Sequence, residues 1–280
     1  MVIGAASFGN LEIIGIALIM LFAWAILVEP LWIEKRVLTL EIPNLPPELD
    51  GLRLAFVSDT HCGAWSKRRF FNRAWHWLSR HNPDILLLGG DVVVSHARSS
   101  WLDDLSGLSG WNPPLGKFAV LGGHDRTYNP LEVSDGLRQI GVTVLCNESV
   151  RFERQGKHWW LTGLADNSDY PMLCNAPLAL QEVPAAEPAL ALVHSPDFAL
   201  TPEAGRFSLI LSGHTHAGQV RVPWLGAPQC VTALPRANDH GFTHPCGLNL
   251  FVTRGLGCTV RLRFCCRPEV CLLILKRTVA

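Results

Sequence analysis

The sequence predicts an α/β protein built on a buried sheet and preceded by one helix that spans a membrane. Short apolar runs alternate with segments of helical spacing and with polar loops, and this alternation favours a sheet covered by helices. The runs are nearly continuous rather than alternating, as expected for strands buried on both faces. A separate apolar segment near the N-terminus is long enough for a membrane span.

The N-terminal segment, residues 11–28, carries a single charged side chain, Glu12, and no proline. About 20 apolar residues cross a bilayer, and the flanking residues complete that length. A buried core helix would show a polar face, and a signal peptide would need a basic start and a small-residue cleavage site. Neither feature is present, so we expect residues 1–36 to form a retained membrane anchor.

Basic residues follow this anchor directly, at Lys35 and Arg36, and none precedes it. Because positive charge tends to stay in the cytoplasm, we expect a single-pass protein of the cell (inner) membrane with its C-terminal domain in the cytoplasm. The opposite orientation stays open, since Glu29 and Glu34 lie beside the two basic residues. Residues 37–50 are expected to be a proline-rich connector, and residues 51–280 the folded domain.

Within this domain, short apolar runs flanked by glycine and polar residues predict buried strands. They lie at 52–57, 85–88, 118–121, 189–193 and 209–211. Helical spacing predicts helices at 70–80, 101–108 and 131–140. Strands of a more antiparallel region are expected at 249–253, 259–264 and 270–275.

The composition excludes two broad classes of protein. The 24 Lys and Arg residues balance 24 Asp and Glu, and hydrophobic residues make up 48% of the 280 residues. A disordered chain would need more charge and fewer apolar residues. A nucleic-acid binder that works by bulk positive charge would not be neutral, so we expect no nucleic-acid partner.

Acidic or histidine side chains follow five of the predicted strands directly, at the point where each strand ends. They are Asp59 and His61, Asp91, His124 and Asp125, His194, and His214 and His216. Ligands of α/β sheets bind outside the carboxyl ends of the strands. One such motif arises easily by chance, but five in succession predict a metal site.

The spacing of these residues suggests how they share an ion. In an extended chain, residues i and i+2 point the same way, so Asp59 with His61, and His214 with His216, could each face one cation. The carboxylate of Asp91 could bridge two cations through its two oxygens. Mixed carboxylate and imidazole ligands suit Mn, Fe or Zn better than Ca or Mg.

These motifs resemble those of the calcineurin-like metallophosphoesterase superfamily. They read SDTH (58–61), GGD (89–91), GGHD (122–125), VHSPD (193–197) and SGHTHAGQ (212–219). The segments 216–223 and 255–270 are similar to its membrane-anchored bacterial phosphodiesterase branch. The resemblance implies a sandwich of two mixed β-sheets flanked by helices, with a dinuclear metal centre at one edge.

The resemblance also implies a role for each residue of the centre. Asp59, His61 and His216 would hold the first ion, Asp91 would bridge, and His194 and His214 would hold the second ion. The catalytic pair would be His124, beside the leaving group, and Asp125, which would orient His124. Arg126, Arg221 and Arg254 are candidates to hold a second phosphate.

One position departs from the family pattern, because Gly123 stands where the family has a metal-binding asparagine. Glycine has no side chain to coordinate a cation. We therefore expect the second metal site to be weaker or more selective than usual. A catalytically weak, metal-dependent binding protein is the alternative from another functional class.

The implied reaction is hydrolysis of a phosphoric ester or diphosphate, with a phosphodiester or pyrophosphate as the expected bond. A membrane tether concentrates the domain near substrates in the bilayer, which favours membrane-associated and lipid-linked phosphates. The specific alternative is hydrolysis of UDP-2,3-diacylglucosamine in lipid A synthesis. The sequence does not determine the oligomeric state.

Overall fold

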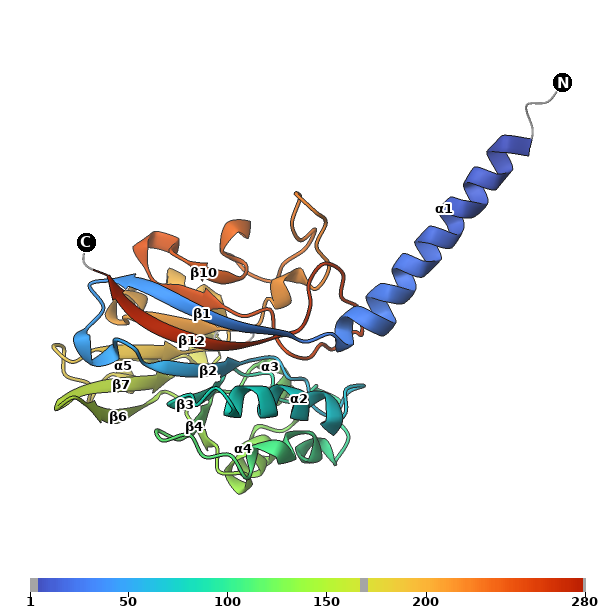
Figure 1. Cartoon of the computed structure of the whole chain (residues 1–280). Helices are drawn as coiled ribbons and strands as arrows, with labels where there is room; N and C mark the ends of the chain where they lie inside the picture. Colours follow the sequence, from blue (N-terminus) through green and yellow to red (C-terminus); the bar gives the residue numbers. More distant parts are fainter. Residues whose placement is uncertain (1–4, 167–170, 279–280) are drawn as a thin grey trace.

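Two six-stranded sheets form the body of the molecule, and a long N-terminal helix projects away from it (Figure 1). This computed structural model describes residues 5–166 and 171–278. The sheets pack face to face, with helices on the outer side of the first sheet. The architecture confirms the predicted sandwich of two mixed sheets.

The first sheet combines neighbours from both ends of the chain. Its order is β1 (Glu34–Pro43), β12 (Glu269–Thr278), β2 (Arg53–Val57), β3 (Ile85–Leu88), β4 (Lys117–Ala119) and β5 (Thr143–Val144). β2 to β5 run parallel, whereas β12 is antiparallel to β2 and parallel to β1. The parallel run brings the carboxyl ends of β2, β3 and β4 to one edge.

The second sheet is parallel in its middle and antiparallel at both ends. Its order is β10 (Gly241–Thr243), β11 (Leu250–Val252), β9 (Leu209–Ser212), β8 (Ala189–Leu192), β7 (Lys157–Gly163) and β6 (Glu148–Arg154). The parallel pairs of β7, β8 and β9 place their carboxyl ends at one edge. The expected antiparallel region is therefore only partly present, because β11 pairs in parallel with β9.

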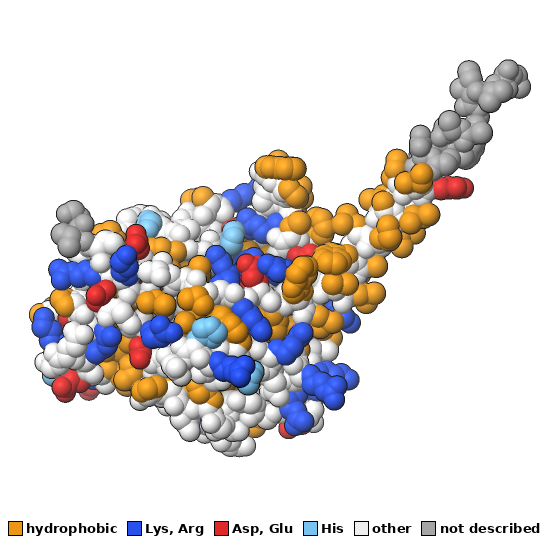
Figure 2. Space-filling view, viewed as in Figure 1, with side chains coloured by type: hydrophobic (Ala, Val, Ile, Leu, Met, Phe, Trp, Pro, Cys, Tyr) orange, Lys and Arg blue, Asp and Glu red, His pale blue; other side chains and the backbone are white. Residues whose placement is uncertain are grey.

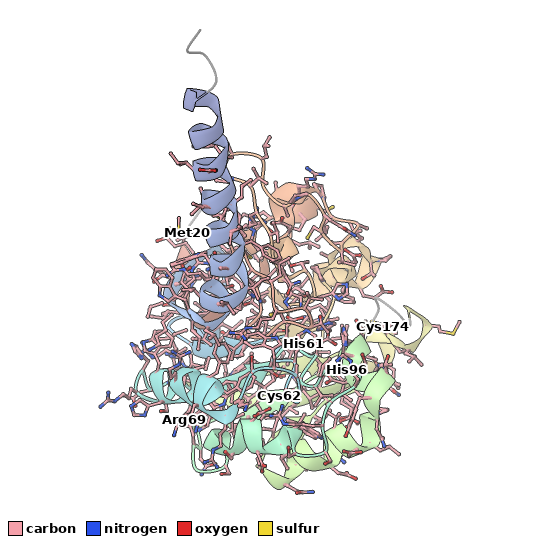
Figure 3. The ribbon with its side chains drawn as sticks, turned by 90° about the vertical axis from the view of Figure 1, so that its right-hand side faces the viewer. Met20, His61, Cys62, Arg69, His96 and Cys174 are labelled. Carbon is pink, nitrogen blue, oxygen red and sulfur yellow. The ribbon has the colours of Figure 1, made fainter. Side chains whose placement is uncertain are left out.

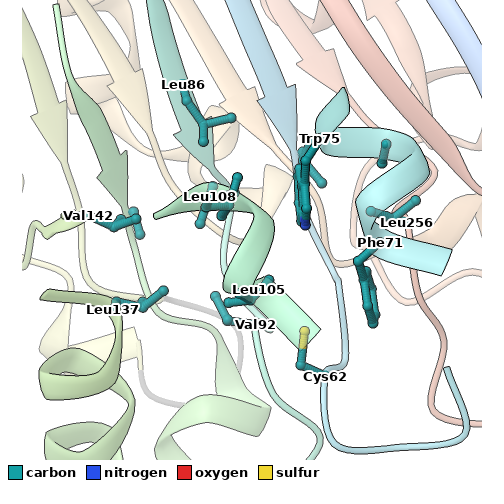
Figure 4. Close-up of a cluster of buried hydrophobic side chains, with 14 of the residues drawn as sticks. Cys62, Phe71, Trp75, Leu86, Val92, Leu105, Leu108, Leu137, Val142 and Leu256 are labelled. Carbon is teal, nitrogen blue, oxygen red and sulfur yellow. The ribbon is translucent and has the colours of Figure 1, made fainter. Parts of the chain in front are cut away.

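Apolar layers hold the sheets together. Between them, Phe56 of β2 lies 6.0 Å from Phe251 of β11, measured between ring centroids. Outside the first sheet, α2 (Arg68–Ser79) and η4 (Trp101–Leu108) pack with α4 (Pro130–Gln139) over the strands. Figure 4 shows this layer, with Phe71 and Trp75 facing the sheet. Burial of large side chains at about 1.5–3 kcal/mol each makes these layers the main source of stability.

The remaining helices are short and lie in the connections. They are α3 (Gly123–Tyr128), α5 (Ala176–Ala179), η3 (Pro47–Leu49), η5 (Pro171–Leu173), η6 (Pro196–Leu200), η7 (Pro202–Arg206), η8 (His216–Gly218), η9 (Arg236–Asn238) and η10 (Pro245–Gly247). The predicted helix at 101–108 is present as the 3₁₀-helix η4 rather than as an α-helix.

Two segments differ from the sequence expectation. Residues 259–264 form no strand and make one isolated bridge, between Phe264 and Val220, so that prediction is wrong. The segment instead wraps around the buried Arg263, whose guanidinium donates to backbone carbonyls. Residues 34–43, expected in the anchor and the connector, form β1 and pair along their whole length with β12. The folded body therefore includes residues before position 51.

The N-terminal helix α1 (Ala5–Ala23) continues through η1 (Trp24–Val28) and η2 (Glu29–Leu31). The segment Glu12–Leu31 has 20 residues and a mean hydropathy of 2.3, so it is long and apolar enough to cross a membrane. Only 17% of its apolar window is buried in the protein, and Ile19 is 70% exposed. The helix thus lacks the burial of a core helix, as the sequence predicted.

Candidate metal centre

The predicted residues meet at the edge where the parallel strands of both sheets end. Asp59 follows β2, Asp91 follows β3, His194 follows β8 and His214 follows β9. Figure 3 labels His61 inside the body of the molecule. The carboxyl ends of parallel strands lie together, and so residues far apart in sequence converge.

Left-handed backbone aims these side chains. The φ angle is +53° at Asp59, +45° at His61, +48° at Asp91, +69° at His214 and +49° at His216. Such conformations cost about 1–3 kcal/mol each in non-glycine residues and cluster at functional sites. The explanation from an extended chain, in which residues i and i+2 face the same ion, is therefore wrong.

The first half of the centre consists of Asp59, His61 and His216, whose potential ligand atoms all lie within 4.8 Å of one another. His61 Nε2 lies 3.0 Å from His216 Nε2, and His216 Nε2 lies 3.4 Å from Asp59 Oδ1. Burial lowers the pKa of His61 to about 3 and also lowers the pKa of His216 well below its usual value. Both rings are therefore neutral and can offer nitrogen lone pairs to a cation.

The second half of the centre begins with His194, whose Nδ1 lies 2.8 Å from the carbonyl oxygen of Gly89. A carbonyl only accepts, so Nδ1 carries the hydrogen and donates it. His194 Nε2 is then the free nitrogen. It is buried without a hydrogen bond among the described residues, 3.3 Å from Asp91 Oδ2. A carbonyl behind the ring is the usual arrangement of metal-ligating histidine, so the residues fit a cation.

Asp91 lies between the two halves. Its Oδ2 is 3.3 Å from His194 Nε2 and 3.9 Å from His61 Nε2, and its Oδ1 accepts the backbone N–H of His124 at 2.9 Å. Burial raises the pKa of this carboxyl, but His194 and the other histidines outweigh it, so the pKa lies below its ordinary value. Asp91 is therefore ionised and suitably placed to contact two cations.

The same carboxylates set the charge of their neighbours. Burial lowers the pKa of His194, yet the Asp91 carboxylate raises it by more, so the pKa lies well above its usual value. Burial raises the pKa of Asp59 to about 6, although its oxygens accept the backbone N–H of His214 at 3.1 Å. The centre thus favours the binding of positive charge, whether protons or metal cations.

His214 and Gly123 border the open side of the second half. Both line a cavity of about 420 Å³ that also reaches Asp91 and His124. The His214 ring packs edge-on against His194, with centroids 5.1 Å apart, but His214 does not join the three close groups of potential ligands. Because Gly123 has no side chain, this side of the centre has one fewer donor than the first half.

His124 is held by Ser95 rather than by Asp125. Its Nδ1 accepts the backbone N–H of Ser95 at 3.2 Å and lies 3.1 Å from Ser95 Oγ. Asp125 instead accepts the backbone N–H groups of Val93, at 2.8 Å, and Gly122, at 3.0 Å. The prediction that Asp125 orients His124 is thus wrong. Burial raises the pKa of Asp125 to about 7.

Two supporting residues, Ser95 and Arg263, carried no recognisable signal in the sequence. Arg263 is fully buried, donates to the carbonyl of Gly257 at 2.7 Å, and lies 3.3 Å from His216 Nδ1. Cys266 adds a thiol contact to the carbonyl of His216 at 3.3 Å. These residues pack behind His216 and restrict its position.

The end of the apolar helix is tied to this supporting segment. The Ala25 carbonyl accepts the backbone N–H of Arg263 at 2.9 Å, and Glu29 Oε1 accepts the backbone N–H of Cys266 at 2.6 Å. The side chain of Glu29 is buried. A continuous set of contacts therefore runs from the helix to His216.

The three arginines suggested for a second phosphate have different surroundings. Arg221 pairs with Asp239 at 2.8 Å, and Arg254 pairs with Glu269 at 2.7 Å. Both guanidinium groups are therefore committed to carboxylates. Arg126 of α3 makes no ion pair within the part of the chain that the structure describes.

Comparisons with known proteins agree with this geometry. The family model described as calcineurin-like phosphoesterase matches residues 52–218, which include every residue predicted for the centre. The phosphodiesterase YaeI of Escherichia coli (strain K12) is 31% identical, over 88% of this chain and 89% of that protein. The UDP-2,3-diacylglucosamine pyrophosphatase LpxG of Chlamydia muridarum is 24% identical, over 94% and 95%. A transmembrane protein with metallophosphoesterase domain from Danio rerio is 29% identical, over 86% and 57%.

Proposed function

The chain belongs to the calcineurin-like phosphoesterase family of hydrolases, and from this premise we propose that it cleaves a phosphodiester or pyrophosphate bond at a dinuclear metal centre. The observation that carries the proposal is the buried pair of His194 Nε2 and the ionised Asp91, 3.3 Å apart, with the Gly89 carbonyl behind the His194 ring. Although burial lowers the pKa of His194, Asp91 raises it by more, so a proton lies between the two groups, and a metal cation would take its place. The other four proposed ligands, Asp59, His61, His214 and His216, lie around the same place.

We assign the ligands as the family pattern implies. Asp59, His61 and His216 would hold one divalent ion, Asp91 would bridge, and His194 and His214 would hold the other. Their mixed oxygen and nitrogen donors favour Mn, Fe or Zn. The ions, when bound, would polarise the phosphoryl oxygens and lower the pKa of the attacking water. Gly123 leaves the second ion with fewer protein donors, so we expect that ion to bind more weakly.

His124 is the proposed acid for the leaving oxygen. In the neutral ring Nδ1 accepts the Ser95 N–H, and in the protonated ring Nδ1–H can donate to Ser95 Oγ, so the Nε2–H is left to give its proton to the leaving oxygen. The ring packs edge-on against His61 at 4.8 Å and borders the cavity. A positioned acid contributes about 10²–10⁴ in rate. Asp125 contributes indirectly, since it holds the backbone of Val93 and Gly122 on either side of the site.

A membrane-associated substrate is supported by the apolar surface near the cavity. Val231 lines the cavity and is 60% exposed, and Trp224 and Leu225, which line a separate hollow, are strongly exposed as well. Exposed apolar groups of this kind mark contacts with lipid or with partners. Together with the apolar helix, they favour a phosphate that carries a lipid. The similarity to LpxG along most of both chains favours UDP-2,3-diacylglucosamine as the specific candidate.

We further propose that the apolar helix over Glu12–Leu31 anchors the protein in the cell (inner) membrane as a single span, since residues 34–36 belong to β1. Lys35 and Arg36 follow the span, which favours a cytoplasmic position for the domain. In a cell with a reporter fused to the C-terminus, a cytoplasmic reporter signal is expected. A periplasmic signal would reverse the orientation without affecting the proposed chemistry.

Hydrolysis by the full chain in detergent tests the function. After removal of metal with a chelator, added Mn²⁺ should restore release of nitrophenol from bis(p-nitrophenyl) phosphate, and UDP-2,3-diacylglucosamine is then compared with soluble diphosphates. Asp91→Asn should be inactive, whereas Asp135→Asn, a matched change on the exposed face of α4, should be unaffected. Metal binding without hydrolysis of any substrate would favour the alternative, a catalytically weak binding protein.

A further inference from the structure

A second hollow lies away from the metal centre, beside the end of the apolar helix. Its volume is about 480 Å³, and its lining includes Leu31, Trp65, Lys67, Arg69, Arg73 and Arg261. Four of these side chains are basic, and no carboxylate from the described residues lines the hollow. None of the lining residues belongs to the proposed centre.

The positive charges of the four basic side chains are not balanced by nearby carboxylates. None of them makes an ion pair with a carboxylate in the described parts of the chain, and Lys67 and Arg69 are exposed. Like charges gathered around one hollow repel one another, and a bound anion would relieve this repulsion. In Figure 3 the labelled Arg69 lies at the periphery of the body, below α1.

The other two basic residues are positioned by the helix itself. Arg73 donates to the carbonyl of Leu31 at 2.8 Å, and Arg261 lies within 3.5 Å of the carbonyl of Leu27. The guanidinium of Arg261 also lies 5.0 Å from the Trp65 ring centroid, and its Nε has no hydrogen-bond partner among the described residues. The hollow is therefore attached to the end of the helix and has donor capacity left over.

With the helix across a membrane, as proposed above, this hollow would lie in the head-group layer. The candidate span runs over Glu12–Leu31, and Leu31 forms part of the hollow. Trp24 and Trp32 are partly exposed at the same end, where tryptophan is enriched in membrane proteins. Figure 2 shows apolar side chains along the helix that Figure 1 labels α1, and basic side chains beside the base of this helix.

We propose that this basic hollow binds the phosphate head group of an anionic phospholipid in the membrane that the helix spans. The inference rests on the proposed membrane anchoring and adds a lipid-binding site outside the metal centre. Basic residues next to a membrane span attract acidic lipids, and each Lys or Arg contributes about 1 kcal/mol to the binding free energy. Leu31, Phe70 and Trp65 supply an apolar wall for the lipid beyond its head group. A bound lipid would limit the rotation of the domain about the helix.

Native mass spectrometry of the full chain in detergent tests the site, with dioleoylphosphatidylglycerol and dioleoylphosphatidylcholine as probes. The wild-type protein should retain phosphatidylglycerol in preference to phosphatidylcholine. The double variant Lys67→Gln, Arg69→Gln should weaken phosphatidylglycerol binding about thirtyfold, because each of the two charges contributes about 1 kcal/mol. The control Arg138→Gln, Lys157→Gln removes the same charge from exposed positions elsewhere and should bind as the wild type does.

Three results would overturn the proposal: equal retention of both lipids, an equal loss in the control variant, or complete displacement by an equal concentration of soluble glycerol 3-phosphate. The last result would assign the hollow to a soluble phosphate. The outcome is separable from the proposed function, because hydrolysis of bis(p-nitrophenyl) phosphate by Lys67→Gln, Arg69→Gln should match the wild type. Conversely, Asp91→Asn should lose hydrolysis and keep its phosphatidylglycerol. Extraction of the wild type from membranes by alkaline carbonate would refute the anchoring separately.

Discussion

The two halves of the centre are built from similar residues but differ in how completely they are enclosed. In the first half, Asp59, His61 and His216 converge, and Arg263 packs behind His216. In the second half, His194 is held by one carbonyl, and its open side borders the cavity at Gly123. A closed half suits tight retention of an ion, whereas an open half leaves positions for water and substrate.

The halves also differ in what supports them. The segment behind His216 is tied to the end of the apolar helix through Glu29 and Cys266. His194 follows β8 and is held by the ends of β3 and β9, through the Gly89 carbonyl and the N–H of Gly213. The comparison teaches that the first half is positioned by long-range contacts that include the apolar helix, while the second half is positioned by the sheet edge.

The largest effect is expected from Asp91→Asn, because Asp91 serves both halves. The amide removes the shared negative charge, so both ions should be weakened and kcat on bis(p-nitrophenyl) phosphate should fall by about 10³ or more, since metal catalysis is worth several kcal/mol. Metal content by atomic emission and turnover are measured on the same sample. Unchanged turnover would contradict a shared carboxylate.

His124→Ala tests whether the residue beside the first half acts on the substrate or on the metal. As an acid it should lower kcat by about 10²–10⁴ and leave metal content near the wild-type value. The structure also places His124 in a close group with His61 and Asp91. Loss of metal in parallel with kcat would therefore make it a ligand, and His124→Gln, which keeps a polar side chain, provides the comparison.

Gly123→Asn would sharpen the contrast by adding the donor that the second half lacks. We expect the weaker ion to bind about tenfold more tightly. Even a residue that only hydrogen-bonds to a metal ligand changes metal affinity about 10–100-fold, and the introduced asparagine would contact the ion itself. The tighter ion should keep its affinity in a titration of metal-free protein. Gly123→Ala controls for the backbone, and two equally tight ions in the wild type would refute the premise.

Ser95→Ala should give the smallest change in kcat of these variants. It removes the Oγ contact to His124 but keeps the backbone N–H, so a loss of one ordinary hydrogen bond, about 0.5–1.5 kcal/mol, should lower kcat about two- to tenfold. The pH profile of kcat should shift with it, since the ring loses a partner of Nδ1. A changed unfolding temperature with an unaltered pH profile would instead indicate a purely structural role.

The sequence was informative about the residues of the site and less so about their geometry. The Asp and His residues that follow the strands were recognisable because an apolar run and the polar cluster after it are adjacent in the chain. The left-handed turns at Asp59 and His214 were not recognisable from the sequence, since neither residue type requires a positive φ. Ser95 and Arg263 have no motif, and their importance comes from contacts with distant residues.

Two segments, residues 34–43 and 259–264, show that sequence pattern alone does not decide where a strand forms. Residues 34–43 alternate in burial along β1, but their partner β12 lies at the other end of the chain. Residues 259–264 alternate polar and apolar side chains in the sequence and form no strand, because Arg263 turns inward to the carbonyls behind His216. A pattern of alternation shows that a strand is compatible with the sequence, and a partner is needed to form it.

The sequence by itself determined the α/β class, the apolar helix, the family motifs and the missing donor at Gly123, because each is a local property of residue type and spacing. Only the tertiary structure decided which nitrogen of His194 is free, that Ser95 rather than Asp125 holds His124, and that four basic residues surround the end of the helix. His61 and His216 come within 3.0 Å although 155 positions separate them. Such contacts depend on how the sheets pack, which no short stretch of sequence specifies.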